Sequence, residues 1–214
     1  MKPIETDDLT IHFDSRACIH ARRCVLGLPG VFNPDARPWI NPANGVSKDI
    51  EAVIESCPSG ALRYQRKNGE TEAQARTNTI RVWENGPLEV RGDIRVEGQA
   101  PRTRALLCRC GKTDNPPFCD NSHRQGFSAT GLPPFHEKRD RVPEETAGPL
   151  TVTPQENGSY KIEGPVEIIA GDGSRVARVG KAFLCRCGSS GDKPFCDGSH
   201  RKIGFHKASS VTVE

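Results

Sequence analysis

The sequence has no long apolar run and little apolar material of any kind. Hydrophobic residues make up 35% of the 214 positions, and aromatic residues only 6%. No stretch of about 18 consecutive apolar residues occurs, so a membrane-spanning helix is not expected. Gly and Pro are abundant, at 21 and 17 residues. This composition favours loops around small cores, and small cores usually need a metal, a disulfide or a partner for stability.

A strong net charge is also missing. The net charge is only +3, and acidic and basic residues are interspersed, so nucleic-acid binding is not expected. The start, MKPIETDDLTIHF, has no apolar signal segment, and nine is an odd number of cysteines. A secreted disulfide scaffold is therefore not favoured. We expect a cytoplasmic protein, because clustered cysteines in a reducing compartment more often bind metal.

The cysteines reveal an internal repeat. They fall in three groups of three, and the second and third groups superimpose with an offset of 77 residues in LLCRCGKTDNPPFCDNSHRQGF and FLCRCGSSGDKPFCDGSHRKIGF. The ligand-type residues that keep this register are Cys108, Cys110, Cys119 and His123 in the first copy, and Cys185, Cys187, Cys196 and His200 in the second. The repetition predicts two copies of one metal-binding unit.

Each copy has a predicted local structure that would gather these residues. Alternating runs at 79–96 and 149–168 are broken by Asn-Gly, which predicts strands joined by tight turns. Two cysteines separated by one residue share a face of a strand, with Arg109 or Arg186 between them pointing away. Asp120 and Asp197 are expected to cap a helical turn, which would bring a cysteine toward the histidine four residues later.

A Cys3His set accepts zinc as well as iron. The order C-x-C-x8-C-x3-H, with a hydroxyl residue in the loop and Asp-x-Ser-His at the end, resembles the CDGSH, or NEET, iron–sulfur family over about residues 79–214. Asn121, in place of glycine, is the one departure. The resemblance implies a [2Fe-2S] cluster in each motif, and two β-rich repeats packed as an intrachain pseudo-dimer. Zinc is the main alternative, and an inert set of cysteines is the weakest.

The single histidine of each motif has two expected consequences. A neutral imidazole in place of a thiolate makes the site less negative and should raise its reduction potential. A histidine protonated at the iron-binding nitrogen cannot bind, so cluster loss in mild acid is expected as well.

A different unit precedes the repeats. LTIHF at 9–13 alternates as a strand, and ALRY at 61–64 is expected to pair with it. Ser47 is expected to cap a helix over KDIEAVIES, and Cys57-Pro58 to end that helix.

The three cysteines of this unit form a looser motif. Cys18-x5-Cys24 with a distant Cys57-Pro58 resembles the divergent single-cluster bacterial ferredoxins over about residues 9–66. A full [4Fe-4S] set has a further cysteine between the first two, where this chain has Ala21. Three thiolates suit a [3Fe-4S] cluster. His20 as a fourth ligand would suit a [4Fe-4S] cluster, and the absence of any cluster is the third alternative.

The expected fold class is α+β. A small ferredoxin-like domain at 1–66 and a linker at 67–78 precede CDGSH repeats at 79–132 and 149–214, which are joined by a linker at 133–148.

The expected function follows from the cofactors. No nucleophile–base pair, phosphate loop or organic-cofactor fingerprint occurs, so the chain is not expected to be an enzyme. We expect electron transfer through two [2Fe-2S] clusters and one [3Fe-4S] cluster, with an unknown redox partner. The alternatives are cluster storage, transfer to an apo-acceptor protein or redox or pH sensing, and, after these, a zinc-stabilised binding module. No nucleic-acid or membrane partner is expected, and pairing of the repeats within one chain favours a monomer.

Overall fold

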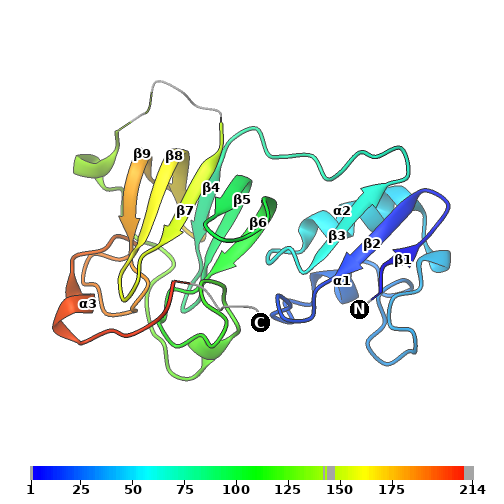
Figure 1. The fold of residues 1–214 in the computed structure, drawn as a ribbon, viewed down its shortest axis with the longest axis horizontal. Helices are drawn as coiled ribbons and strands as arrows, with labels where there is room; N and C mark the ends of the chain where they lie inside the picture. The colour runs from blue at the N-terminus through cyan, green and yellow to red at the C-terminus, as the bar shows by residue number, and fades with distance from the viewer. Residues whose placement is uncertain (1, 142, 144–147, 210–214) are drawn as a thin grey trace. The chain divides into compact units, whose positions relative to one another are not determined.

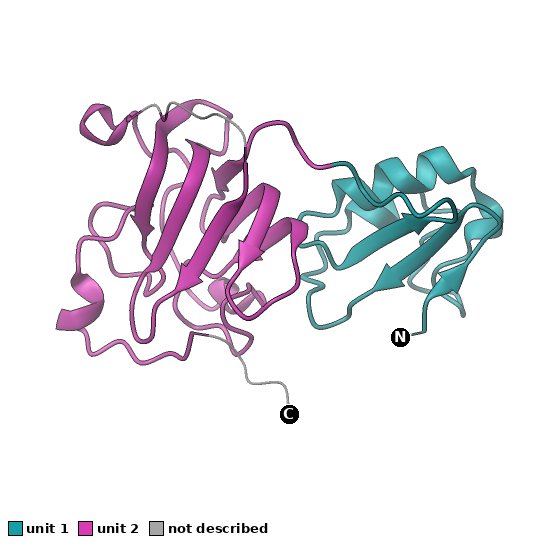
Figure 2. Cartoon of the chain, turned by 45° about the horizontal axis from the view of Figure 1, so that its top comes forward, with its two compact units in different colours: residues 1–73 teal, residues 74–214 magenta. Residues whose placement is uncertain are grey.

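The computed structural model describes residues 2–141, 143 and 148–209. The chain divides into two units, 1–73 and 74–214, which Figure 2 shows in different colours. Each unit has its own apolar core. The fold is β-rich with few helices, in agreement with the expected α+β class.

The first unit is a small antiparallel sheet with a helix packed against it. The central strand β2 (Leu9–Phe13) pairs with β1 (Ile4–Glu5) and with β3 (Leu62–Arg66). The helix α2 (Ser47–Ser56) contributes Ile50 and Ile54 to the core, since residues four apart lie on one face of a helix. The predicted pairing of the strand at 9–13 with the strand that follows the helix is confirmed.

Two short helices, α1 (Arg23–Gly27) and η1 (Pro42–Asn44), lie between β2 and α2. The prediction that Ser47 caps α2 is wrong. Val46 is the N-cap, and Ser47 is the first helical residue, whose hydroxyl donates to Asp8 Oδ2 at 2.7 Å. The helix ends at Cys57 as expected, because the residue before a proline avoids the helical conformation.

The second unit contains two copies of a three-stranded pattern. The first copy has β4 (Thr79–Val82), β5 (Leu88–Val96) and β6 (Arg102–Leu107), and the second has β7 (Leu150–Pro154), β8 (Tyr160–Ile169) and β9 (Arg175–Leu184). Asn85 and Asn157 adopt left-handed backbone angles before glycine in the first turn of each copy, which confirms the predicted Asn-Gly turns.

The two copies exchange strand pairings within one sheet. β4 pairs antiparallel with β5 of its own copy and parallel with β8 of the other. β7 likewise pairs antiparallel with β8 and parallel with β5. The four strands thus form a closed circuit of pairings, and β6 and β9 extend it from β5 and β8. Apolar side chains alternate along these strands and form a single core.

The loops that carry the two cysteine motifs follow β6 and β9, and Figure 1 shows both loops at the same end of the sheet. The first loop contains the short helix η2 (Ser122–Arg124), and the second contains α3 (Ser199–Lys202). Their position follows from the pairing, because β6 and β9 run in equivalent directions at equivalent places in the two copies.

The segments expected as linkers are partly packed. Glu72 accepts the backbone N–H of Tyr64 within the first unit, and Asn78 donates to the carbonyls of Gly148 and Pro165 within the second. In the segment 133–148, the described residues include η3 (Glu137–Arg139), which packs against β9.

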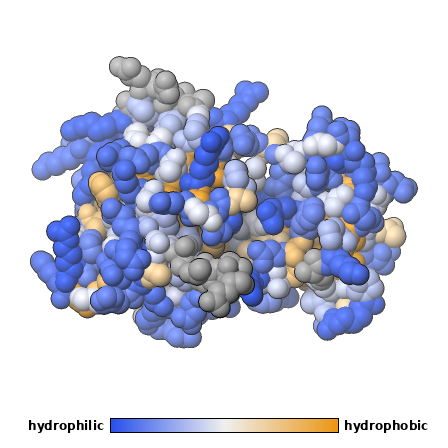
Figure 3. All heavy atoms as spheres, viewed as in Figure 1, coloured by the Kyte–Doolittle hydropathy of each residue, from blue (hydrophilic) through white to orange (hydrophobic). Residues whose placement is uncertain are grey.

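No helix among the described residues is long and apolar enough to cross a membrane. On the face drawn in Figure 3, hydrophilic residues cover most of the surface, and apolar residues form small separate patches.

Candidate metal centres

The structure brings the four ligand-type residues of the first repeat together as two close pairs. The Sγ atoms of Cys108 and Cys110 lie 3.6 Å apart. Cys119 Sγ lies 3.3 Å from Nδ1 of His123. The pairs meet because the chain turns back on itself after β6: the N–H of Cys119 donates to the carbonyl of Leu106 at 2.9 Å.

The second repeat has the same arrangement. Cys185 Sγ and Cys187 Sγ are 3.9 Å apart, and Cys196 Sγ lies 3.4 Å from His200 Nδ1. The N–H of Cys196 donates to the carbonyl of Phe183 at 2.8 Å. All eight residues therefore lie in such pairs. The prediction that each C-x-C pair lies within a strand is wrong, because Cys108–Cys110 and Cys185–Cys187 lie just after the strands.

These distances fit metal binding in pairs. Two thiolates bound tetrahedrally to one metal ion at about 2.3 Å lie about 3.8 Å apart, close to the separations within the cysteine pairs. Among the described residues, no group of three or more His, Cys, Asp or Glu side chains is placed to hold one metal ion. Each motif thus offers two close pairs of metal-ligand side chains.

Backbone N–H groups face the sulfur atoms. The N–H of Lys112 lies 3.5 Å from Cys110 Sγ, that of Asn121 lies 3.5 Å from Cys119 Sγ, and that of Gly198 lies 3.4 Å from Cys196 Sγ. Such contacts stabilise a thiolate, because they place partial positive charge next to the anion.

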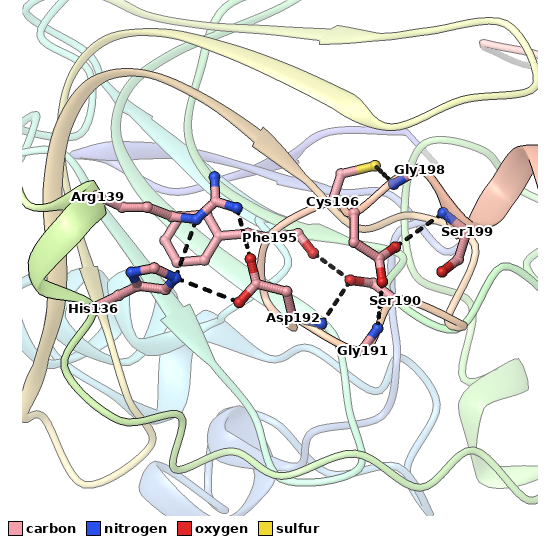
Figure 4. Close-up of polar contacts among 10 residues, drawn as sticks. His136, Arg139, Ser190, Gly191, Asp192, Phe195, Cys196, Gly198 and Ser199 are labelled. Carbon is pink, nitrogen blue, oxygen red and sulfur yellow. Dashed lines mark hydrogen bonds and ion pairs between the residues drawn. The ribbon is translucent and has the colours of Figure 1, made fainter.

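The loop hydroxyl has a structural role in each copy. Thr113 Oγ1 donates to the carbonyl of Phe118 at 2.7 Å, and Ser190 Oγ donates to that of Phe195 at 2.7 Å. Each hydroxyl is buried. Figure 4 shows Ser190 between Asp192 and Phe195. The hydroxyl therefore closes the loop that positions the third cysteine of each motif, Cys119 or Cys196.

The aspartate of each motif does not have the expected capping position. The N-caps are Asn121 and Gly198, with left-handed φ values of 77° and 86°, so Asp120 and Asp197 are not caps but precede them. Asp197 still accepts the N–H groups of Ser199 and Gly191 at 2.9 and 2.8 Å. The hydrogen bond from the Ser199 side chain, together with these two N–H groups, holds the pKa of Asp197 well below its usual value. Asparagine tolerates this backbone angle, which explains why it can stand in for glycine.

The arginine between the first two cysteines is one of the largest buried side chains. Arg109 is 1% exposed. Its guanidinium donates to four backbone carbonyls, those of Trp83, Gly86, Ala129 and Thr130, at 2.6–3.1 Å. Burial lowers the pKa of Arg109 to about 10, and the negative charge of Cys185 in the other repeat opposes this shift.

Arg186 occupies the matching position and is 2% exposed. Its Nη2 donates to the carbonyls of Lys207 and Ala208, while Nε and Nη1 have no partner among the described residues. Burial lowers its pKa, and the charges of Tyr160 and of Cys108 in the first repeat act in the opposite direction. Both arginines thus point away from their own cysteines, as expected, and interact electrostatically with the other motif.

The two motifs also touch through glycines. A Cβ atom on Gly111 would lie 2.7 Å from the carbonyl oxygen of Cys187, and one on Gly188 would lie 2.8 Å from that of Cys110. Both glycines have positive φ. Each motif therefore packs its glycine against the second cysteine of the other.

The three cysteines of the first unit line one cavity of about 380 Å³. Ala21 and His20 line the same cavity. Burial raises the pKa values of Cys18 and Cys24, and the charge of Cys57 acts in the same direction. This is expected of neighbouring thiols in the absence of a positive partner.

The loop around Ala21 is conformationally unusual. His20 and Arg22 have φ values of 52° and 61°, a region that residues with a side chain rarely adopt. Strained backbone of this kind gathers at binding sites. Its effect here is to wrap the segment between Cys18 and Cys24 around the cavity.

Two contacts around the motifs were not predicted. Tyr160 of the second repeat donates its hydroxyl to the ligand loop of the first, and Arg139 of the inter-repeat segment binds Asp192 in the second loop. The one signal in the sequence for the Tyr160 contact is that a residue with a hydroxyl stands at an otherwise apolar strand position. The segment around Arg139 carries both signs of charge and resembles solvated surface.

The fold and the paired ligands define an iron–sulfur binding protein. The family model described as "Divergent 4Fe-4S mono-cluster" matches residues 4–67, and that described as "Iron-binding zinc finger CDGSH type" matches residues 85–124 and 157–201. A protein named "Uncharacterized protein YjdI" of Escherichia coli (strain K12) is 36% identical over 61 residues, which are 28% of this chain and 80% of that protein. The YjdI protein of Escherichia coli O157:H7 matches to the same extent. The chain belongs to the divergent 4Fe-4S mono-cluster family through its first unit and to the iron-binding CDGSH family through its second.

Proposed function

We propose that the chain is an electron-transfer protein, not an enzyme, that carries two [2Fe-2S] clusters and one [3Fe-4S] cluster. The observation that supports it most is the division of each Cys3His set into two pairs, each 3.3–3.9 Å across. Two bridged irons need two ligands each, whereas a single zinc ion needs four around one point. When bound, such clusters take up and release single electrons.

The two repeats form an intrachain pseudo-dimer in this proposal. The reciprocal strand pairings of β4 with β8 and β5 with β7 support it, as do the reciprocal contacts of Gly111 and Gly188. Arg109 and Arg186 would then place a buried positive charge near the cluster of the opposite repeat. Positive charge near a cluster favours its reduced form, so the arginines would raise both potentials.

Anaerobic purification followed by iron and sulfide analysis tests this proposal. Two [2Fe-2S] clusters and one [3Fe-4S] cluster require about seven iron and eight acid-labile sulfide ions per chain. Electron paramagnetic resonance of the oxidised and reduced protein distinguishes the cluster types. Colourless protein that contains zinc and no sulfide would overturn the proposal and favour a zinc-stabilised binding module.

A second candidate function is cluster storage and transfer. His123 and His200 are only partly buried, so each motif has a neutral ligand within reach of solvent and of an acceptor protein. Transfer of intact clusters to an apo-acceptor would support this function. Many redox cycles without loss of iron would favour electron transfer.

The cavity of the first unit gives a prediction about its cluster. Ala21 lines the cavity between Cys18 and Cys24, so we expect Ala21→Cys to supply a fourth thiolate. The variant should gain about one iron per chain and lose the signal of an oxidised [3Fe-4S] cluster, with a reduced [4Fe-4S] signal in its place.

The matched control for this prediction is Ala17→Cys, since Ala17 does not line the cavity. This control should keep the iron content and spectrum of the native protein. An unchanged spectrum in Ala21→Cys would show either that the native cluster already has four irons or that this corner is closed to a ligand, and iron analysis separates the two.

A further inference from the structure

The ligand loop of the first repeat is supported from inside the fold. The hydroxyl of Tyr160, on β8 of the second repeat, lies 2.8 Å from the carbonyl oxygen of Cys108 and 2.9 Å from that of Pro117. Tyr160 has no exposed surface. Tyr160 pairs with Leu184 as Leu88 pairs with Leu107, so the matching position in the first repeat is a leucine. Leu88 has no hydroxyl, so this strand position donates no equivalent hydrogen bond to the second ligand loop.

The second ligand loop is supported from outside. We call residues 135–141 the strap. The N–H groups of His136 and Arg141 donate to the carbonyls of Val176 and Arg178 on β9, both at 2.8 Å. The N–H of Arg178 in turn donates to Asp140 Oδ1 at 2.6 Å. The strap is thus fixed along the free edge of the second repeat.

Two side chains of the strap reach the second loop, as Figure 4 shows. Arg139 Nη2 binds Asp192 Oδ2 at 2.6 Å, and His136 Nε2 lies 3.4 Å from Asp192 Oδ1. The guanidinium of Arg139 also stacks over the ring of Phe195 at 4.5 Å, and the His136 ring meets the same ring edge-on at 5.3 Å.

These contacts hold the segment that delivers Cys196. Phe195 is 1% exposed, and its N–H donates to the carbonyl of Asp192 at 2.8 Å. Cys196 follows Phe195 directly, so a displacement of Asp192 reaches Cys196 through this hydrogen bond and the backbone of Phe195. In the first repeat the matching ring is Phe118, which lies under Arg102 of its own strand β6 at 4.3 Å. The strap is therefore specific to the second loop.

We infer that Arg139 and His136 are positioning residues that set how firmly the second motif holds its cluster. As a result, the cluster of the second motif is the more readily exchanged of the two. The inference rests on the proposed function, because it requires a cluster in each motif. The side chains of Arg139 and Asp192 are each 38% exposed, so salt or a competing charged group can weaken their ion pair. The hydrogen bonds of Tyr160 are buried and do not respond in this way.

Cluster loss to an iron chelator tests this inference in the complete protein. We expect each CDGSH motif to contribute its own kinetic phase to the loss of visible absorbance, in addition to any change from the cluster of the first unit. Arg139→Ala should accelerate one phase about fivefold, the combined effect of an exposed ion pair and a cation–π contact. Tyr160→Phe should accelerate the other phase. Added salt should speed the first phase in the native protein but not in Arg139→Ala.

The control variant is Lys138→Ala, the exposed neighbour of Arg139, which should leave both phases unchanged. The charge exchange Arg139→Asp with Asp192→Arg should restore much of the native rate, which a general loss of packing would not allow. Circular dichroism identifies any variant that fails to fold.

Two results would overturn the inference in distinguishable ways. If the purified protein contained no acid-labile sulfide, both the proposed function and the role of the strap would be contradicted. Protein with the full sulfide content, in which Arg139→Ala changes both phases equally or neither, would overturn the role of the strap alone.

Discussion

Replacing Gly111 with alanine is expected to destabilise the second unit by about 3 kcal/mol, from left-handed backbone strain and a steric clash together. The new methyl group would lie 2.7 Å from the carbonyl oxygen of Cys187 and 3.0 Å from the Phe205 ring, at a φ of 77°. The Cys187 segment must move to relieve this contact. We therefore expect iron to be lost from both motifs, not only from the one that carries the substitution.

Gly98→Ala is the matched control for this substitution. Gly98 has a nearly identical φ of 74°, but its added Cβ would meet no atom within 4 Å. It should show only the backbone strain, about 1 kcal/mol. Urea unfolding and iron content measured side by side would test the prediction. Equal losses in the two variants would mean that the contact between the motifs contributes nothing.

Replacing Arg109 with methionine is expected to have a still larger effect, a loss of about 4 kcal/mol or more. The substitution keeps much of the side-chain volume but leaves four backbone carbonyls without their charged donor. A hydrogen bond to a charged group contributes about 1.5–3 kcal/mol. The carbonyls of Trp83 and Ala129 also accept the N–H groups of Gly86 and Asn85, so these two keep a donor in the variant. Relaxation and entry of water reduce the sum below the total of four bonds.

Arg186→Met distinguishes the contribution of this hydrogen-bond network to stability from that of burying an arginine. Arg186 is as buried as Arg109 but donates to only two carbonyls among the described residues. Its replacement should cost about half as much or less. Thermal and urea unfolding of the two purified variants would show the difference. If Arg186→Met were the more destabilised variant, the four-carbonyl network would not be the main source of stability.

The sequence alone predicted which candidate ligand side chains lie together, because metal-binding motifs place suitable residue types at short, fixed spacing. Cys108, Cys110, Cys119 and His123 and their counterparts lie in one loop each, so local geometry brings them together. The strands were predictable for the same reason, since alternation and Asn-Gly turns are local patterns.

Contacts made over long distances in the sequence could not be predicted in this way. The pairing of β4 with β8 joins residues about 90 positions apart, and no local pattern encodes it. Ser47 is not the cap because α2 begins one residue earlier than expected, with Val46 as the N-cap, and the hydroxyl of Ser47 instead donates to Asp8, in the turn before β2. The contacts of the strap could not be predicted either, because mixed charges are typical of solvated surface and only the fold places Arg139 beside Asp192.

The exchange of strands between the two repeats has a consequence for how the protein can evolve. In an assembly of two identical chains, every mutation is copied into both halves, so a helpful change at one site is imposed on the other. Here both halves of the sheet belong to one chain, so a mutation in one half leaves the other half unchanged. The two repeats differ at corresponding positions: Tyr160 corresponds to Leu88, and Asp192 corresponds to Asn115. Two identical chains could not have acquired such differences. Covalent linkage thus allows the loops of the two motifs to be held by different contacts, those of Tyr160 in one and those of Arg139 in the other.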